Sequence, residues 1–72
     1  MRTLADLKPG ESAYIVNFTD EFLALKFIEM GCLPGEEITF DNSAPFGCPL
    51  AYFVGGYKLS MRKTEASTIV ID

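Results

Sequence analysis

Short runs in which apolar and polar residues alternate recur along the chain, and such alternation predicts half-buried β-strands. These runs cover residues 12–17, 38–41, 50–54, 57–61 and 68–71. The third and fourth runs are joined by Gly55-Gly56, a two-residue linker that is typical of a tight β-hairpin. The linker predicts three facing pairs, which are Leu50 with Met61, Tyr52 with Leu59, and Val54 with Tyr57.

Between the first two runs, apolar residues recur with the spacing of an amphipathic helix. The predicted inward stripe comprises Leu23, Ala24, Phe27, Ile28 and Met30. Thr19 or Asp20 can cap the start of this helix, and Gly31 can close it by adopting a positive φ. Pro34-Gly35 then forms a tight turn before the next strand. We interpret the stripe as the surface that packs on the sheet, and not as a docking face, because such stripes usually face a core.

These elements predict a mainly β fold with one α-helix between the first and second strands. Short helical turns are expected at residues 3–7 and 64–66. Five strands in 72 residues cannot bury both faces of an open sheet. We therefore expect the sheet to curl into a small, closed or nearly closed barrel. No repeat or linker divides the chain, so residues 1–72 are expected to form a single domain.

The composition narrows the classes of partner. A formal net charge of −4 argues against nucleic acid, because binding to phosphates requires clustered Lys and Arg. No apolar run approaches the roughly 18 residues of a membrane span, and Arg2 followed by Asp6 does not resemble the start of a signal peptide. We therefore expect a cytoplasmic protein that does not insert into a membrane. In a reducing compartment, Cys32 and Cys48 are expected to be free thiols.

Few residues of the chain are suited to catalysis or to metal binding. It has no histidine, which removes the commonest general base and the commonest metal ligand. Glu36-Glu37 is an adjacent carboxylate pair, and we expect both to be solvated, so the chain is not expected to be an enzyme. Cys32 and Cys48, with Glu36, Glu37 or Asp41, offer only a weak Fe²⁺ or Zn²⁺ site, because structural zinc sites usually have four ligands. We expect no resident cofactor.

Two segments of the chain resemble the signatures of the FeoA family. The proteins of this family are small cytosolic partners of bacterial ferrous iron transport. In residues 27–38 the end of the helix is followed by Gly31, Pro34-Gly35 and a strand. The second signature runs through residues 44–49, Gly56, residues 59–62 and residues 65–66. The resemblance covers essentially the whole chain. It implies an SH3-like barrel, and it implies binding to FeoB, a membrane permease with a cytosolic GTPase domain, whose activity the chain would modulate.

Two functional hypotheses follow from the residues and the resemblance. In the first, the chain is a binding module whose apolar patch suits a protein partner. The residues of that patch are Pro45, Phe46, Pro49, Phe53 and Tyr57. In the second, the chain is a metal-responsive regulatory domain, because it also resembles the barrel that is appended to iron-dependent repressors. A small barrel leaves strand edges that a second copy can cover, so the sequence also allows a homodimer.

Overall fold

Six strands form one antiparallel sheet in the computed structural model, which describes residues 1–43, 45 and 47–72. In chain order the strands are β1 (Arg2–Thr3), β2 (Ser12–Phe18), β3 (Glu37–Ser43), β4 (Leu50–Val54), β5 (Tyr57–Met61) and β6 (Ile69–Ile71). The helical elements are a 3₁₀ turn, η1 (Leu4–Asp6), and two α-helices, α1 (Glu21–Glu29) and α2 (Lys63–Ala66). The strands lie in the order β1-β6-β2-β3-β4-β5, so β1 and β5 are the edges of the sheet.

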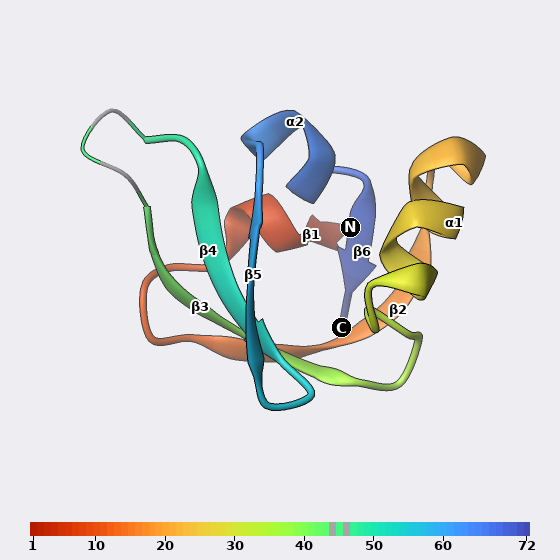
Figure 1. Cartoon of the computed structure of the whole chain (residues 1–72), viewed down its shortest axis with the longest axis horizontal. Helices are drawn as coiled ribbons and strands as arrows, with labels where there is room; N and C mark the ends of the chain where they lie inside the picture. The colour runs from red at the N-terminus through yellow and green to blue at the C-terminus, as the bar shows by residue number, and fades with distance from the viewer. Residues whose placement is uncertain (44, 46) are drawn as a thin grey trace.

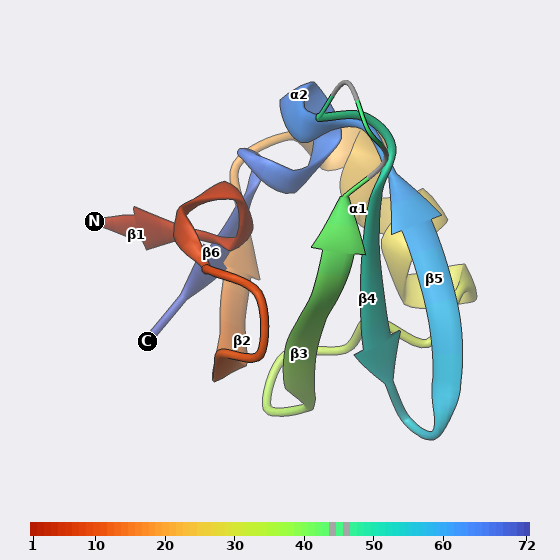
Figure 2. The same ribbon diagram turned by 90° about the vertical axis from the view of Figure 1, so that its left-hand side faces the viewer.

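The sheet curls because β2 takes part in both of its halves. The first residues of β2 pair with β3, whereas residues from Ile15 onward pair with β6. The register shifts at Val16 in β2 and at Asp41 in β3, and such bulges bend a strand and increase its twist. Figure 1 shows β2 crossing the lower part of the view and rising beside α1, and Figure 2 shows β3, β4 and β5 side by side. The curled sheet thus surrounds one shared core.

The β4–β5 hairpin has the register that its Gly55-Gly56 turn predicts, and all three expected pairs are present. Both glycines have a positive φ, of 58° and 90°, as a tight two-residue hairpin requires. The buried hydroxyl of Tyr52 donates a hydrogen bond to the carbonyl oxygen of Leu4 at 3.2 Å, so β4 holds η1 against the core. Burial, and secondarily the charge of Cys48, raise the pKa of Tyr52 to about 12. The hydroxyl therefore keeps the proton that it donates at neutral pH.

The two ends of helix α1 are stabilised by the residues predicted to do so, which are Asp20 at the start and Gly31 after the end. The carboxylate of Asp20 accepts a hydrogen bond at 3.0 Å from the backbone N–H three residues later, which is the role of an N-cap residue. At the other end, Gly31 has a φ of 92°. Its N–H donates to the Ile28 carbonyl at 3.1 Å, and the Cys32 N–H donates to the Phe27 carbonyl at 2.8 Å. This pair of bonds is a Schellman motif, and it turns Cys32 into the core beside Phe27.

The core lies between the curled sheet, η1 and the inner side of α1. Its largest fully buried side chains include Tyr52, Phe27, Leu4, Ile15, Ile38 and Ile69. Leu23 and Met30 pack partly buried against this core, as the helical stripe predicts. The prediction is wrong at Ile28, which is 43% exposed. Successive residues of a helix are rotated by about 100°, so a helix that points Phe27 inward turns Ile28 toward solvent.

The mainly β prediction is confirmed, with α1 between the first two predicted strands, but the number of strands is wrong by one. Strand β1 pairs with β6, with Arg2 opposite Ile71 and Thr3 opposite Val70. The sequence pattern predicts only a helical turn at residues 3–7, and this turn is present as η1, with Thr3 as its N-cap. Within the described residues, β1 and β5 do not pair with each other, so the sheet is curled without being closed by hydrogen bonds.

No helix in the described part of the chain is both long enough and apolar enough to cross a membrane.

An ion pair joins α2 to α1. The Lys26 ammonium lies 2.9 Å from Oε2 of Glu65, which is 19% exposed, whereas Lys26 is 53% exposed. The other carboxylate oxygen of Glu65 accepts a hydrogen bond at 2.8 Å from the Arg62 backbone N–H, at the start of α2. The hydrogen bond from the Arg62 backbone lowers the pKa of Glu65 the most, and the hydrogen bond from Lys26 is the second largest cause. The ionised form of Glu65 therefore stabilises the fold.

We expect Glu65→Gln to lower the free energy of unfolding by about 0.2–1 kcal/mol at pH 7. The difference should shrink in acid. Folding lowers this pKa, so the stabilisation is complete above the unfolded value of about 4.3 and is lost as the pH falls through the folded value. Urea denaturation at pH 7 and pH 3 measures both differences, and Lys26→Met removes the ion pair while the backbone bond stays. An equal loss of stability at both pH values would contradict a role for the charge.

Candidate functional site

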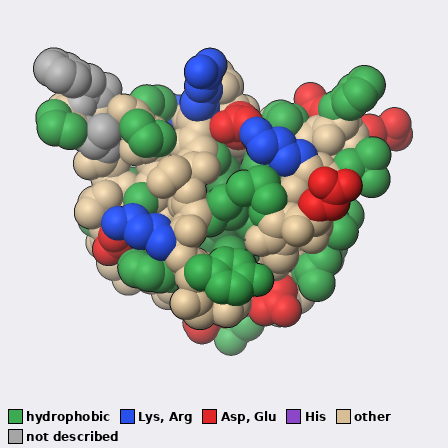
Figure 3. All heavy atoms as spheres, in the orientation of Figure 1, with side chains coloured by type: hydrophobic (Ala, Val, Ile, Leu, Met, Phe, Trp, Pro, Cys, Tyr) green, Lys and Arg blue, Asp and Glu red, His purple; other side chains and the backbone are tan. Residues whose placement is uncertain are grey.

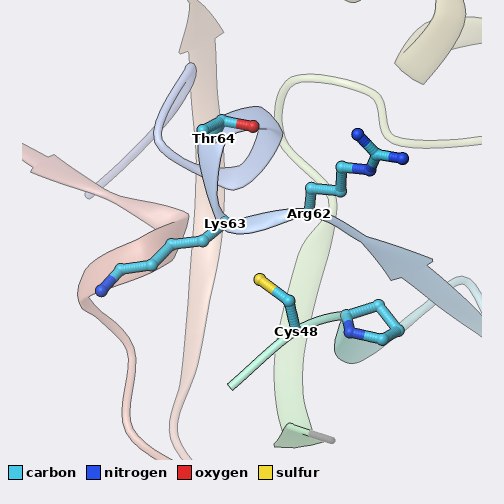
Figure 4. A pocket seen from close by; sticks show the side chains of 5 residues that line it. Cys48, Arg62, Lys63 and Thr64 are labelled. Atoms are coloured by element: carbon cyan, nitrogen blue, oxygen red, sulfur yellow. The ribbon is translucent and has the colours of Figure 1, made fainter. Parts of the chain in front are cut away.

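The loop between β3 and β4 and the start of α2 line an open pocket of about 560 Å³. Its lining residues are Cys48, Pro49, Arg62, Lys63 and Thr64. The Cys48 thiol points toward the backbone of residues 62–64, whereas the Arg62 and Lys63 side chains extend away in opposite directions (Figure 4). The two cations therefore do not converge on one point, as they would around a bound anion.

The structure places the predicted partner-binding residues at separate positions. Pro45 and Pro49 are exposed in the β3–β4 loop, and Phe46 lies outside the described residues. Phe53 and Tyr57 are 44% and 59% exposed, but they point to opposite faces of the hairpin, because Phe53 pairs with the residue after Tyr57. Pro49 and Tyr57 also lie at opposite ends of β4, whose five residues span roughly 17 Å. These positions do not form one continuous patch, and their binding role stays a prediction.

The two cysteines lie in different environments. Cys32 is fully buried, and burial raises the pKa of its thiol to about 11. Cys48 is exposed, and both thiols are free, as predicted. A neutral thiol such as Cys32 is a poor metal ligand, because the thiolate is the form that binds. Glu36 and Glu37 are exposed, and nowhere in residues 1–43, 45 and 47–72 do three His, Cys, Asp or Glu side chains gather as metal ligands would. A weak Fe²⁺ or Zn²⁺ site at these residues stays a prediction.

We expect one thiol of the native chain to react quickly with a maleimide at pH 7.5. Cys48 is exposed, whereas Cys32 becomes reactive only when the core opens. If opening costs roughly 3 kcal/mol or more, Cys32 reacts at least about 100-fold more slowly. Mass spectrometry over time measures both rates, and Cys48→Ser serves as the control that should abolish the fast phase. Two similar rates in the native chain would contradict the burial of Cys32.

A group of exposed apolar side chains lies on the outer side of α1, where the sequence pattern did not place a site. It comprises Phe22 (89% exposed), Leu25 (66%) and Ile28 (43%) on the helix, together with Leu33 (41%) in the segment that follows the helix, and we call it the α1 outer face. Phe22, Leu25 and Ile28 are three residues apart, so they follow one another along the helix. Figure 3 shows hydrophobic and acidic side chains interspersed over α1, along the right-hand edge of the view. Apolar residues outside the inward stripe were the available signal, since a helix with one buried face usually has a polar opposite face.

The chain matches known proteins over nearly its full length. The model of the FeoA domain family matches residues 2–72. The Fe(2+) transport protein A/Fe(2+) transporter FeoB fusion protein of Porphyromonas gingivalis is 31% identical over 70 residues, which are 96% of this chain and 8% of that protein. The chain therefore spans less than a tenth of this curated relative.

Solved structures give the same result for the fold. FeoA of Stenotrophomonas maltophilia, a procaryotic SH3 domain protein in complex with zinc, is 30% identical with a TM-score of 0.87, over 100% of this chain and 91% of that one. Iron(II) transport protein A of Clostridium thermocellum is 35% identical with a TM-score of 0.89, over 99% of this chain and 44% of that one. The expected SH3-like fold is thus confirmed. The chain belongs to the FeoA domain family, which is associated with ferrous iron transport.

Proposed function

We propose that the chain is a small cytoplasmic accessory protein of ferrous iron uptake, which binds a FeoB-type permease and modulates its GTPase domain through protein–protein contacts. One observation carries the proposal. In the Porphyromonas gingivalis relative, a segment similar to this chain is fused to the FeoB transporter. A fusion holds two parts at an effective concentration that reaches millimolar values when the linker is short. A separate chain of the same family has to make the contact through its own surface.

The residues of the chain support binding more than catalysis. The sequence has no histidine, and no Asp, Glu, Lys or Arg side chain among the described residues is buried. General acid–base catalysis requires a titratable group that is positioned beside the reacting atoms. Exposed apolar groups, in contrast, occur on α1 and on the hairpin, and contiguous groups of this kind mark interaction sites. We therefore propose a module that has no reaction of its own.

Calorimetric titration of the chain into the purified cytosolic part of the FeoB-type permease from the same organism tests the proposal. We expect one-to-one binding with a dissociation constant on the order of micromolar, which corresponds to about 8 kcal/mol. GTP hydrolysis measured in the same mixtures should change as the complex forms. The absence of binding at a chain concentration of about 1 mM, where the binding free energy would be weaker than about 4 kcal/mol, would overturn the proposal.

A further inference from the structure

The α1 outer face is continuous enough to receive another segment of protein. Its first three residues follow one another at intervals of three along the helix, and Leu33 lies just beyond the Schellman turn at Gly31. Single exposed apolar residues are normal on protein surfaces, but a contiguous group marks an interaction site. Phe22 extends almost entirely into solvent, with 89% of its surface exposed. A large aromatic side chain in this position can insert into a partner, as anchoring residues of interfaces do.

The charges around the α1 outer face are acidic. Glu21 and Glu29 are exposed on the same helix. The one cation of α1, Lys26, lies 2.9 Å from the carboxylate of Glu65, so its charge is already compensated. The carboxylate of Asp20 accepts the N-cap hydrogen bond and adds a further negative charge at the start of the helix. An occupant of this face therefore meets apolar groups that are flanked by negative charge.

We propose that the α1 outer face binds a segment of the FeoB-type permease that carries apolar side chains flanked by Lys or Arg; this inference rests on the function proposed above. Basic flanks would pair with Glu21 and Glu29, and such complementarity selects the partner and speeds its association. An amphipathic helix that lies along the face would present its side chains at matching intervals of three and four residues.

Two other occupants fit the charges less well. A second copy of the chain would bring Glu21 and Glu29 of one copy toward the same acids of the other, and the juxtaposition of like charges costs several kcal/mol. The chain as a whole also has a net charge of −4. A membrane surface with anionic lipids attracts basic segments and would repel this acidic one. The charge pattern therefore favours a basic segment of a protein.

The test measures the affinity of three variants for the purified cytosolic part of the permease. Phe22→Glu and Leu25→Glu place a charge on the α1 outer face, and Ser60→Glu is the control with the same change of charge at an exposed position of β5 in the hairpin. Each variant changes the net charge by the same amount at an exposed position, where substitutions usually alter stability by no more than about 0.5 kcal/mol. We expect Phe22→Glu and Leu25→Glu to weaken binding at least 10-fold and Ser60→Glu to change it less than 3-fold. Thermal melts confirm that all three variants are folded.

Charge reversal tests the basic nature of the partner segment. Glu21→Lys combined with Glu29→Lys should weaken binding, and 0.5 M NaCl should weaken binding of the wild-type chain, because salt screens exposed charges. Unchanged or tighter binding of this double variant would overturn the proposal that the partner segment is basic. Wild-type affinity in Phe22→Glu and Leu25→Glu, or a loss confined to Ser60→Glu, would overturn the proposal that the α1 outer face is the binding surface and would leave the proposed function standing.

Two further measurements distinguish a failure of the proposed function from a wrong choice of binding partner for the α1 outer face. The absence of wild-type binding to the permease would overturn the proposed function itself. Sedimentation of the chain alone should show a monomer at about 100 µM, a concentration at which a dimer held by about 8 kcal/mol would be largely assembled. If the chain forms a dimer and Phe22→Glu dissociates it, the α1 outer face binds a second copy of the chain. That result would overturn the proposal that this face binds a segment of the permease.

Discussion

Phe27→Ala is expected to leave a large part of the chain unfolded at 25 °C. Phe27 is 1% exposed, and its ring centroid lies 6.0 Å from that of Phe18 in β2, so the side chain joins α1 to the sheet. Truncation of a buried Phe to Ala costs about 3–5 kcal/mol. A single core of this size supplies only roughly 3–5 kcal/mol of net stability. The substitution therefore removes about as much free energy as the whole fold has.

Urea denaturation followed by circular dichroism measures this loss. Phe27→Leu is the control, because it keeps most of the apolar volume and should cost less than about 1.5 kcal/mol. The alanine variant should show a shortened or absent folded baseline, while the leucine variant unfolds in one cooperative transition. A free energy of unfolding for Phe27→Ala that lies within about 1 kcal/mol of the wild type would contradict the position of this side chain at the centre of the core.

Gly31→Ala is expected to destabilise the chain by about 2 kcal/mol. The residue has a φ of 92°, and the left-handed backbone costs a residue with a Cβ roughly 1–2 kcal/mol. An added Cβ would also lie only 3.1 Å from the hydroxyl oxygen of Tyr57, so the tyrosine would have to move. The Schellman motif that directs Cys32 into the core depends on the same backbone conformation. The loss should therefore appear both in stability and in the protection of the Cys32 thiol.

Gly10→Ala separates the two causes. Gly10 has a similar φ of 87°, but a Cβ there would meet nothing within 4 Å. Denaturation curves of the two variants should show a smaller loss for Gly10→Ala, and the difference should disappear when Tyr57→Ala is added to Gly31→Ala in a double-mutant cycle. Equal losses at the two glycines, with no coupling to Tyr57, would show that the contact at Gly31 has no energetic consequence.

The parts of the fold that local chemistry determines could be predicted from the sequence. The Gly55-Gly56 turn sets the register of its hairpin through its own backbone geometry. The end of α1 at Gly31 likewise depends on one residue and its neighbours. Strand β1 could not be found in this way, because its two residues pair with β6 at the other end of the chain. No pattern of alternation can appear in so short a segment.

The candidate site was less predictable because it depends on which way side chains face after folding. The predicted patch combined residues that are near in sequence, yet Phe53 and Tyr57 lie on opposite faces of one hairpin. Cys32 and Cys48 follow turns of similar composition, but the Schellman motif buries the first and the loop exposes the second. The helical stripe of α1 was assigned to packing, which is right for Leu23, Phe27 and Met30, but Phe22 and Leu25 lie outside that stripe and were given no role.

The most direct test of the proposed binding surface is an NMR titration of the ¹⁵N-labelled chain with the cytosolic part of the FeoB-type permease. We expect the largest changes in amide chemical shift on α1 and on residues 31–33, next to Phe22, Leu25 and Leu33. Smaller changes are expected in β4 and β5. An unchanged spectrum at a saturating concentration of the permease fragment, or changes confined to the β4–β5 hairpin, would contradict the proposed binding surface.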